Sequence, residues 1–326
     1  MSRSFRAALS VASCLGLASA PSMGFAALPC SFERSYPEVT RLDIVDGRLV
    51  ATLGGRFAAG GDPDAPMHLA LDSTATWAVF PGEVPADGTS PEPPQCPTPP
   101  VDADWVRSHG MNPAREIGFR QSVTACVSNA DDVWGALAFS SVDGPYGGAL
   151  FSQDSRSGHY DFWRPLVLTQ HSVSHISFAA DSLWLGIVQE GECIGPAPGF
   201  GIYRIDVLDD RRRDYAYPVT DVCGFAARDM ATFEGAFWVA TELGLARLEE
   251  ASAGEFVWQN YMPDTRSAEL MRPMSCDEIY EAVLNMPHMF TDEAFDLGIA
   301  FDDFWARLSS LRPQFVATYL RKLHGR

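Results

Sequence analysis

The chain has 326 residues, of which 46% are hydrophobic and 20% are charged, a composition that excludes global disorder and supplies a substantial core. Acidic residues outnumber basic ones by 42 to 24, so the formal net charge is −18 and a nucleic acid is an unfavourable partner. No apolar run approaches the ~18 residues that a membrane-spanning helix needs.

The first 26 residues have the pattern of a secretory signal peptide. Arg3 and Arg6 precede an apolar run of mostly small residues from 7 to 20, and cleavage after Ala26 would follow a small residue. In the alternative interpretation Cys14 is a lipid anchor, but the apolar run in front of it is very short. We therefore expect residues 1–26 to be removed and the protein to be exported to the periplasm or the extracellular space.

Six cysteines follow the predicted cleavage site, and an even number suits an oxidising compartment. No two of them form a CxxC pair, which argues against a zinc ribbon or a thioredoxin-type site. Buried unpaired thiols are the alternative. The candidates for disulfide bonds are Cys30, Cys96, Cys126, Cys193, Cys223 and Cys276.

Four stretches of β-like sequence follow in chain order. Each contains short runs of about 4 to 8 residues that are rich in β-branched and aromatic side chains and are separated by Gly, Asp and Pro. A single four-stranded unit cannot bury both of its faces, so neighbouring units must pack face to face around an axis. The units lie at about 38–81, 119–165, 166–218 and 219–263.

Three tryptophans mark the same place in the second run of three units. Trp134, Trp184 and Trp238 are separated by 50 and 54 residues. Because they keep one position in the repeat, we expect them in the core between units rather than in a set that stacks on a ligand. The predicted fold is an all-β propeller with four or five blades of four antiparallel strands, in a closed or an open assembly.

The last unit carries the clearest motif. Its segment 236–248, AFWVATELGLARL, resembles the repeat of two-component-regulator-type propellers, in which each blade has a Trp, a Thr and a Gly-Leu. The resemblance covers about residues 38–263, and the second and third units depart from it through insertions. It implies a β-propeller with a binding or sensing role, and the motif is structural and transfers no catalytic residue.

Two insertions interrupt the units. The third unit has one between its second and third strands, on the face where the chain enters the next blade, so we predict a disulfide between Cys193 and Cys223. The other insertion, at about 82–101, is rich in proline and predicts an extended surface loop that Cys96 fixes to the body. A docking segment for a partner is the alternative interpretation of this loop.

The pattern changes from strands to helices over 266–326. Ser275 and Glu278 have the spacing of a capping box, Thr291 precedes a second helix, and Pro313 suits the first turn of a third. The second helix has an apolar face that either packs on the propeller or binds a partner protein, toward which the basic end 321–326 could steer. That face comprises Leu297, Phe301, Phe304, Trp305 and Leu308.

Two polar patterns invite a catalytic interpretation that their spacing does not support. His171 and His175 would lie about 13 Å apart on a strand with a rise of ~3.3 Å per residue, too far to share a metal ion. Residues 152–154 with Gly158 and Trp163 resemble the Asp-box of sialidase-like propellers. That spacing is too long, and a connection between strands is the better interpretation.

Acidic pairs in predicted turns are the remaining candidates for an ion site. Calcium favours such oxygen ligands, but solvated turn residues are the commoner reason for the pattern, so we expect no cofactor. The pairs are Asp62 and Asp64, Asp131 and Asp132, and Asp209 and Asp210.

The sequence nominates no catalytic residue, because the motifs of nucleotide-binding proteins, zinc proteases and serine hydrolases are missing. It favours an exported, disulfide-stabilised module that binds a protein, a glycan or a small ligand. The alternative is a carboxylate-dependent hydrolase or lyase acting on a glycan or a similar polymer, because blades can bring acids together on their axis. Two close, buried carboxylates there would favour the enzyme.

Overall fold

The computed structural model describes fourteen segments of the chain, and all statements below concern them. They are 38–54, 67–72, 76–82, 84, 96–101, 103–109, 119–129, 132–141, 144–189, 199–207, 215–252, 255–263, 270–285 and 301–324. The predicted signal peptide 1–26 with Cys14, most of the proline-rich insertion, and several candidate residues lie outside them. Those residues are Cys30, Asp62, Asp64, Asp131, Cys193, Asp209, Asp210, Thr291 and Leu297.

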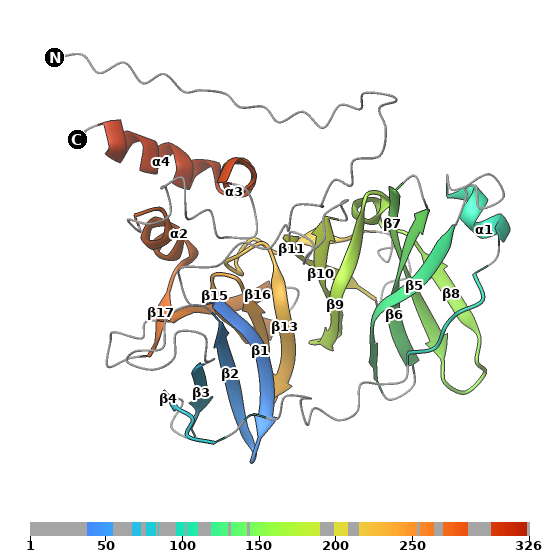
Figure 1. Ribbon diagram of the computed structural model, residues 1–326, viewed down its shortest axis with the longest axis horizontal. Coiled ribbons are helices and arrows are strands. Elements are labelled where there is room, and N and C mark those ends of the chain that lie inside the picture. Colours follow the sequence, from blue (N-terminus) through green and yellow to red (C-terminus); the bar gives the residue numbers. More distant parts are fainter. Residues whose placement is uncertain are drawn as a thin grey trace, which may run out of the picture.

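Four antiparallel sheets make up the β part of the molecule (Figure 1). Blade 1 contains β1 (Glu38–Val45), β2 (Arg48–Gly54), β3 (Met67–Leu71) and β4 (Trp77–Val79). Blade 2 contains β5 (Arg120–Ser128), β6 (Asp132–Ser141), β7 (Gly144–Asp154) and β8 (Tyr160–Trp163). Blade 3 follows the short helix η1 (Leu166–Thr169) and contains β9 (His171–Ala179), β10 (Ser182–Gln189), β11 (Gly199–Asp206) and β12 (Tyr217–Pro218).

Blade 4 has five strands, β13 (Ala227–Phe233), β14 (Ala236–Thr241), β15 (Gly244–Ser252), β16 (Glu255–Pro263) and β17 (Met271–Met274). Within every sheet the strands are hydrogen-bonded in chain order, which is the meander of a propeller blade. The predicted class, an all-β propeller with a helical extension at its carboxyl end, is confirmed.

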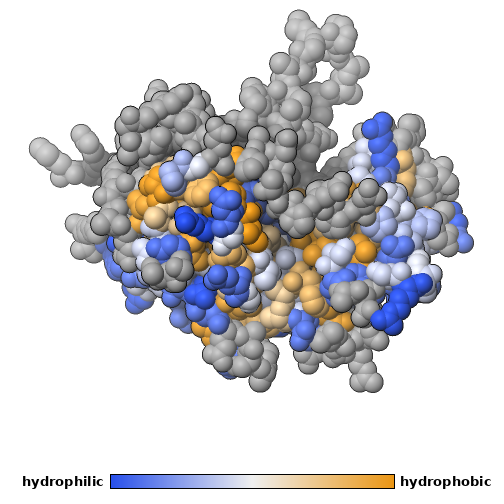
Figure 2. Space-filling view, turned by 90° about the horizontal axis from the view of Figure 1, so that it is seen from below, coloured by the Kyte–Doolittle hydropathy of each residue, from blue (hydrophilic) through white to orange (hydrophobic). Residues whose placement is uncertain are grey.

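The blades pack through their innermost strands and form an open fan. β5 contacts β9, β9 contacts β13, and β13 contacts β1, whereas among the described strands no contact of that extent joins blade 1 to blade 2. The spatial order is therefore 1, 4, 3, 2, with blades 1 and 2 at opposite ends (Figure 1). On the face seen from below, hydrophobic residues gather in the left and central parts, with hydrophilic residues among and below them, and the right end is mainly hydrophilic (Figure 2).

The repeat tryptophans lie in the core, as predicted. Trp134, Trp184 and Trp238 are 4%, 1% and 2% exposed. Trp134 meets Trp163 edge to face with 5.6 Å between ring centroids, and Trp238 meets Trp77 in the same way at 5.9 Å. This burial rules out a stacking platform for a ligand built from the three residues.

Every innermost strand has a β-bulge at the same place in the repeat, one extra residue that lacks a partner in the ladder. The extra residues are Thr40, Thr124, Ser174 and Arg228. In blades 1 to 3 the hydroxyl donates to the backbone carbonyl twelve residues later in the second strand, at 3.1, 3.5 and 3.2 Å. Blade 4 has an arginine instead, which is free to reach a neighbouring blade.

The outer face of blade 2 is covered by the segment that precedes it. Helix α1 (Ala103–Ser108) places Val106, which is 2% exposed, against Phe139 and Phe151 of the blade, with Trp105 and Phe119 packed around them. A disulfide between Cys96 and Cys126 fixes this segment to β5, as expected for Cys96. Blade 2 thus has no bare apolar face where the fan ends.

Three helices, α2 (Cys276–Leu284), α3 (Phe301–Leu311) and α4 (Pro313–His324), lie together beside blade 4 (Figure 1). Ser275 caps α2 in a capping box with Glu278, and Pro313 begins α4, both as predicted. Leu308 is fully buried in a cluster with residues of α2, α4 and blade 4, so α3 packs on the chain itself. The side chains of Phe301 and Phe304 are not among those described.

A second disulfide joins these helices to the propeller. Cys223, in the segment that leads into β13, is bonded to Cys276, the first residue of α2. The predicted bond between Cys193 and Cys223 is therefore wrong, because packing of α2 on blade 4 brings a cysteine 53 residues away to this position. None of the described helices is long and apolar enough to cross a membrane.

Candidate active site

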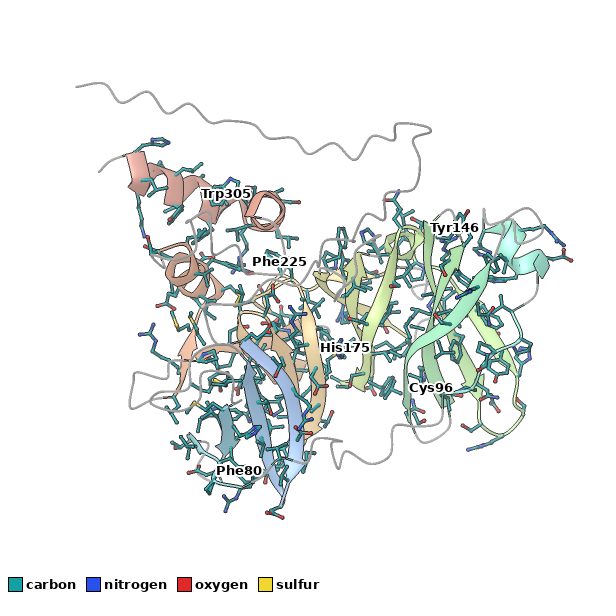
Figure 3. The ribbon with its side chains drawn as sticks, in the orientation of Figure 1. Phe80, Cys96, Tyr146, His175, Phe225 and Trp305 are labelled. Carbon is teal, nitrogen blue, oxygen red and sulfur yellow. A yellow bond between two sulfur atoms is a disulfide. The ribbon has the colours of Figure 1, made fainter. Side chains whose placement is uncertain are left out.

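The repeated bulge places four side chains at equivalent positions near the axis. The residue after the bulge is Arg41 in blade 1, Ala125 in blade 2, His175 in blade 3 and Asp229 in blade 4. Three of these four are ionisable, although each comes from a strand whose other face is packed in the core. His175 marks this level of the fan in Figure 3.

Asp229 joins blade 4 to blade 1. Its Oδ2 accepts a hydrogen bond from the backbone N–H of Leu42, 187 residues away, at 2.8 Å, and its Oδ1 accepts one from Met230 at 2.8 Å. Burial raises the pKa of this carboxyl group and the nearby charge of Asp43 raises it further, while the two hydrogen bonds and Arg41 act in the opposite direction. Asp229 therefore keeps a proton to higher pH than an ordinary aspartate.

Asp43 is the second carboxylate of the site. It is 3% exposed, and Arg41 donates from Nε to its Oδ2 at 2.6 Å. The Arg41 side chain is 33% exposed and that of Asp43 is 4% exposed, so this ion pair runs from the core to the surface. The guanidinium offsets the free-energy cost of burying the negative charge of Asp43.

A histidine lies next to this pair. Nδ1 of His68 on β3 shares a hydrogen bond of 3.0 Å with Thr52 Oγ1 on β2. Burial lowers the pKa of His68, Arg41 lowers it further and Asp43 raises it. The imidazole is therefore biased toward its neutral form, which can both accept and donate a proton.

A further ion pair connects blade 4 to blades 1 and 3. Arg228, the bulge residue of β13, pairs through Nε with Glu38 Oε2 at 3.1 Å, and both side chains are less than one-fifth exposed. Burial and the charge of Arg228 lower the pKa of His175, whose Nδ1 shares a hydrogen bond of 3.0 Å with Ser174. The ion pair thus joins blades 4 and 1, and His175 of blade 3 lies within the field of Arg228.

Two carboxyl groups whose surroundings affect them differently can take different roles in catalysis. The pKa of Asp229 is raised, and Asp43 is held by a guanidinium. Asp43 is buried, Asp229 is partly buried, and the charge of Asp43 acts on Asp229, so these two carboxyl groups are the candidates for the pair of acids that would favour an enzyme. The sequence contains one signal of it, since Arg41 and Asp229 occupy the same position relative to the bulge, but the bulge itself is visible only in the structure.

The histidines considered as a metal pair are not brought together. Both lie on β9, where His171 stacks on Phe200 with 3.7 Å between ring centroids and its Nδ1 is 2.9 Å from the carbonyl oxygen of Val167. His175 instead belongs to the axial group. Within the described segments, no group of three or more His, Cys, Asp or Glu side chains is arranged to hold a metal ion.

The stretch that resembles an Asp-box is a hairpin turn between β7 and β8, as interpreted. One carboxylate oxygen of Asp154 accepts hydrogen bonds from the backbone of Arg156 and Ser157 at 2.9 and 2.6 Å. These bonds lower the pKa of Asp154, and Gly158 supplies the positive φ of 71°. The aspartate stabilises the turn on the surface.

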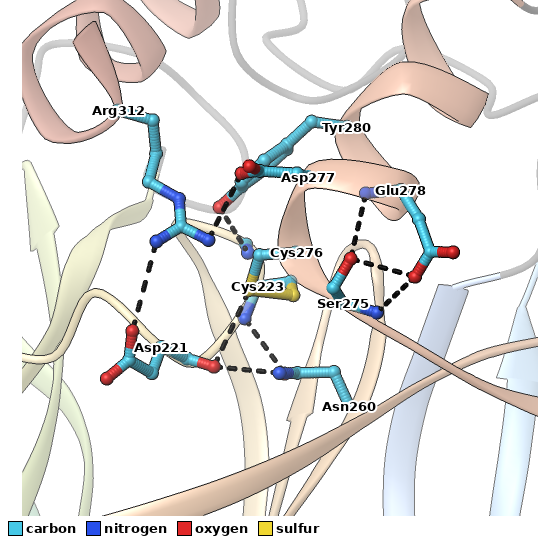
Figure 4. Close-up of polar contacts among 10 residues, drawn as sticks. Asp221, Cys223, Asn260, Ser275, Cys276, Asp277, Glu278, Tyr280 and Arg312 are labelled. Carbon is cyan, nitrogen blue, oxygen red and sulfur yellow. Dashed lines mark hydrogen bonds and ion pairs between the residues drawn. A yellow bond between two sulfur atoms is a disulfide. The ribbon is translucent and has the colours of Figure 1, made fainter. Parts of the chain in front are cut away.

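The most extensive polar network outside the axis holds the helices on blade 4 (Figure 4). Arg312 pairs with Asp277 at 3.3 Å and with Asp221 at 3.8 Å. The backbone N–H of Gly224 donates to the Tyr280 hydroxyl at 3.4 Å, and burial raises the pKa of Tyr280 to about 12. A phenol kept neutral in this way supports packing rather than proton transfer.

No protein-family model matches this chain. No curated protein matches it either. Among solved structures it is similar to the GH43_1 enzyme from Xanthomonas citri complexed with xylotriose, at 11% identity over 72% of this chain and 76% of that chain, with a TM-score of 0.28. An ancestral GH74 enzyme is similar at 9% identity over 85% of this chain and 37% of that one, with a TM-score of 0.29.

Trypanosoma rangeli sialidase in complex with the inhibitor DANA is a third, at 8% identity over 78% of this chain and 57% of that one, with a TM-score of 0.25. Scores this low do not establish a common arrangement, so the propeller assignment rests on the sheets of this chain. A relation to two-component-regulator-type propellers is not shown, and only the propeller-blade part of that resemblance holds.

Proposed function

We propose that this protein is an exported propeller enzyme that hydrolyses a glycosidic bond, with Asp229 and Asp43 as its two carboxyl groups. The observation that carries the proposal is that the charge of Asp43, which is ion-paired to Arg41, acts together with burial to raise the pKa of Asp229. Perturbed acids of this kind concentrate at catalytic sites.

The two groups divide the reaction between them. Asp229 in its protonated form donates a proton to the glycosidic oxygen as the bond to the anomeric carbon breaks. Asp43 as a carboxylate stabilises the positive charge that develops on the sugar and takes a proton from the water that attacks the anomeric carbon. One water molecule is consumed, and proton exchange with solvent returns both carboxyl groups to their starting states.

The position of the site suits a polymer. Arg41, whose side chain is one-third exposed, forms the end of the ion pair that a polymer chain can reach from solvent. The two disulfides support a location in an oxidising compartment outside the cell membrane. An enzyme in that location can encounter polysaccharide substrates.

The test is hydrolysis by the chain that begins at residue 27, measured as release of reducing ends from a panel of neutral and acidic polysaccharides and of nitrophenol from aryl glycosides. We expect the substitutions Asp229→Asn and Asp43→Asn each to reduce the rate by about a hundredfold or more. The control is Asp161→Asn, an exposed aspartate on β8 with 63% side-chain exposure. Equal activity of all three variants, or an inactive parent across the panel, would refute the proposal.

The alternative function, a binding module, has its own support in a different part of the molecule. It does not depend on the axial acids.

A further inference from the structure

A cleft of about 190 Å³ lies between blades 3 and 4, lined by residues of the third and fourth strands of blade 3 and the fourth strand of blade 4. This volume is below the ~300 Å³ of sites for drug-sized ligands and suits a single ring. The residues that give the cleft its chemistry are Arg204, Tyr217, Asp221, Phe256 and Trp258.

Arg204 lies between two aromatic rings. The central carbon of its guanidinium group is 4.4 Å from the ring centroid of Phe256 and 5.6 Å from that of Tyr217. The side chain is half-buried. Within the described part of the chain, the guanidinium makes no hydrogen bond and no ion pair. Two aromatic rings therefore lie within cation–π distance of the guanidinium, and its N–H donors have no protein acceptor among the described residues.

Blade 4 provides an internal comparison. Arg247 has the same place in its blade, because it pairs with Trp238 across the sheet as Arg204 pairs with Trp184. Its guanidinium lies 5.5 Å from the Trp238 ring, but it also pairs through Nη1 with Glu249 at 3.1 Å. An arginine at this position thus has an acidic partner within its own blade in blade 4, although its Nε is buried without one, and in blade 3 it has no acidic partner among the described residues.

The walls of the cleft define the rest of the ligand. Trp258 is packed edge to face on the buried Trp184 with 5.1 Å between centroids, which fixes its orientation. Tyr217 is 38% exposed, and Asp221 is 65% exposed at its side chain. Rigid aromatic surfaces favour the apolar face of a sugar ring, a carboxylate at the rim accepts hydrogen bonds from hydroxyl groups, and a planar guanidinium edge favours a carboxylate.

We propose that this cleft binds a sugar ring that carries a carboxylate, with Arg204 as the carboxylate receptor. The net charge of −18 repels a chain of consecutive negative charges, so the ligand is a terminal or isolated uronic acid unit of an otherwise neutral glycan. The proposal does not rest on hydrolysis at the axis, because none of the residues that line the cleft belongs to the axial group.

The test is a titration of the chain from residue 27 onward with methyl β-glucuronide, methyl β-glucoside and benzoate, followed by tryptophan fluorescence and by ligand-observed NMR. We expect saturable binding of the glucuronide, with the glucoside at least about tenfold weaker. Arg204→Gln should weaken binding of the glucuronide by about tenfold or more. The matched variant Arg247→Gln should bind the glucuronide as tightly as the parent does.

Equal binding of glucoside and glucuronide would remove Arg204 as the receptor, and tighter binding of benzoate would replace the sugar by an aromatic acid. Either result overturns the proposal, as does undiminished binding by Arg204→Gln. If that variant does not fold, Arg204→Lys and Tyr217→Ala serve in its place, and each should weaken the glucuronide. Binding by Asp229→Asn should match the parent, which separates failure of this proposal from failure of catalysis at the axis.

Discussion

The two terminal blades of the fan, blade 2 and blade 1, differ in the residues found where the fan ends. Blade 2 ends in an apolar face, and the chain covers it with Val106, Trp105 and Phe119 and fixes the cover with a disulfide. Blade 1 instead carries polar pairs: Arg41 with the buried Asp43, and His68 with the buried Thr52. Among the described residues, one terminal blade is thus covered by apolar packing, whereas the other combines its core with an ion pair and a hydrogen-bonded histidine.

The largest effect should follow from a charge in the cover of blade 2. Val106→Asp places a carboxylate at a position that is 2% exposed and surrounded by Phe139, Phe151 and Trp105. We expect a loss of about 3 to 5 kcal/mol in the free energy of unfolding, the cost of an uncompensated buried charge. Urea denaturation measures it. Val79→Asp, on β4 of blade 1 and 55% exposed, should change stability little, and equal losses would contradict the comparison.

A smaller loss of stability is expected when the disulfide that holds the cover on blade 2 is removed and the apolar side chains of the cover are kept. Replacing Cys96 and Cys126 together by serine removes a link across 30 residues, worth about 3.6 kcal/mol in the chain-entropy model. The variant should unfold at lower temperature and digest faster with protease within 96–109 than in the blades. Cleavage that begins in blade 1 instead would show that the disulfide is not what protects the cover of blade 2.

The smallest effect concerns pH at the open end. The pKa of His68 is lowered from 6.5 in the folded protein, so on acidification below that value the unfolded chain takes up the proton first and stability falls. His68→Asn should therefore lose less stability than the parent between about pH 7.5 and about pH 5.5. Thr52→Val, which keeps the imidazole but removes its hydrogen bond, should retain a pH-dependent loss. If His68→Asn lost as much stability as the parent over this pH range, the pH dependence could not be assigned to His68.

Local sequence patterns predict the blades and two of the helix starts. The regular spacing of Trp134, Trp184 and Trp238 predicted the blades and their buried layer, because inter-blade packing requires a large apolar residue at one place in each repeat. The capping box at Ser275 and the proline at 313 predicted two helix starts, since these signals act over one helical turn. Export and the boundaries of the domains stay predictions.

Contacts between distant segments were beyond the same reasoning. Cys223 was assigned to Cys193 from the general layout of a propeller, but its partner is Cys276, because the helices pack on blade 4 rather than elsewhere. Whether the blades would close into a ring was left open, and the fan is open between blades 1 and 2. Neither result follows from local pattern, since each depends on which surfaces meet.

The sequence by itself determined the repeating unit, the strand-rich class and the positions of caps and turns, because these follow from side-chain periodicity and backbone preference over a few residues. The tertiary structure alone decided that Asp229 accepts a hydrogen bond from blade 1 within the field of Asp43, and that Arg204 lies near two aromatic rings without an acid. Electrostatics and stacking act through space, and residues 187 positions apart, such as Leu42 and Asp229, become neighbours only when the blades pack.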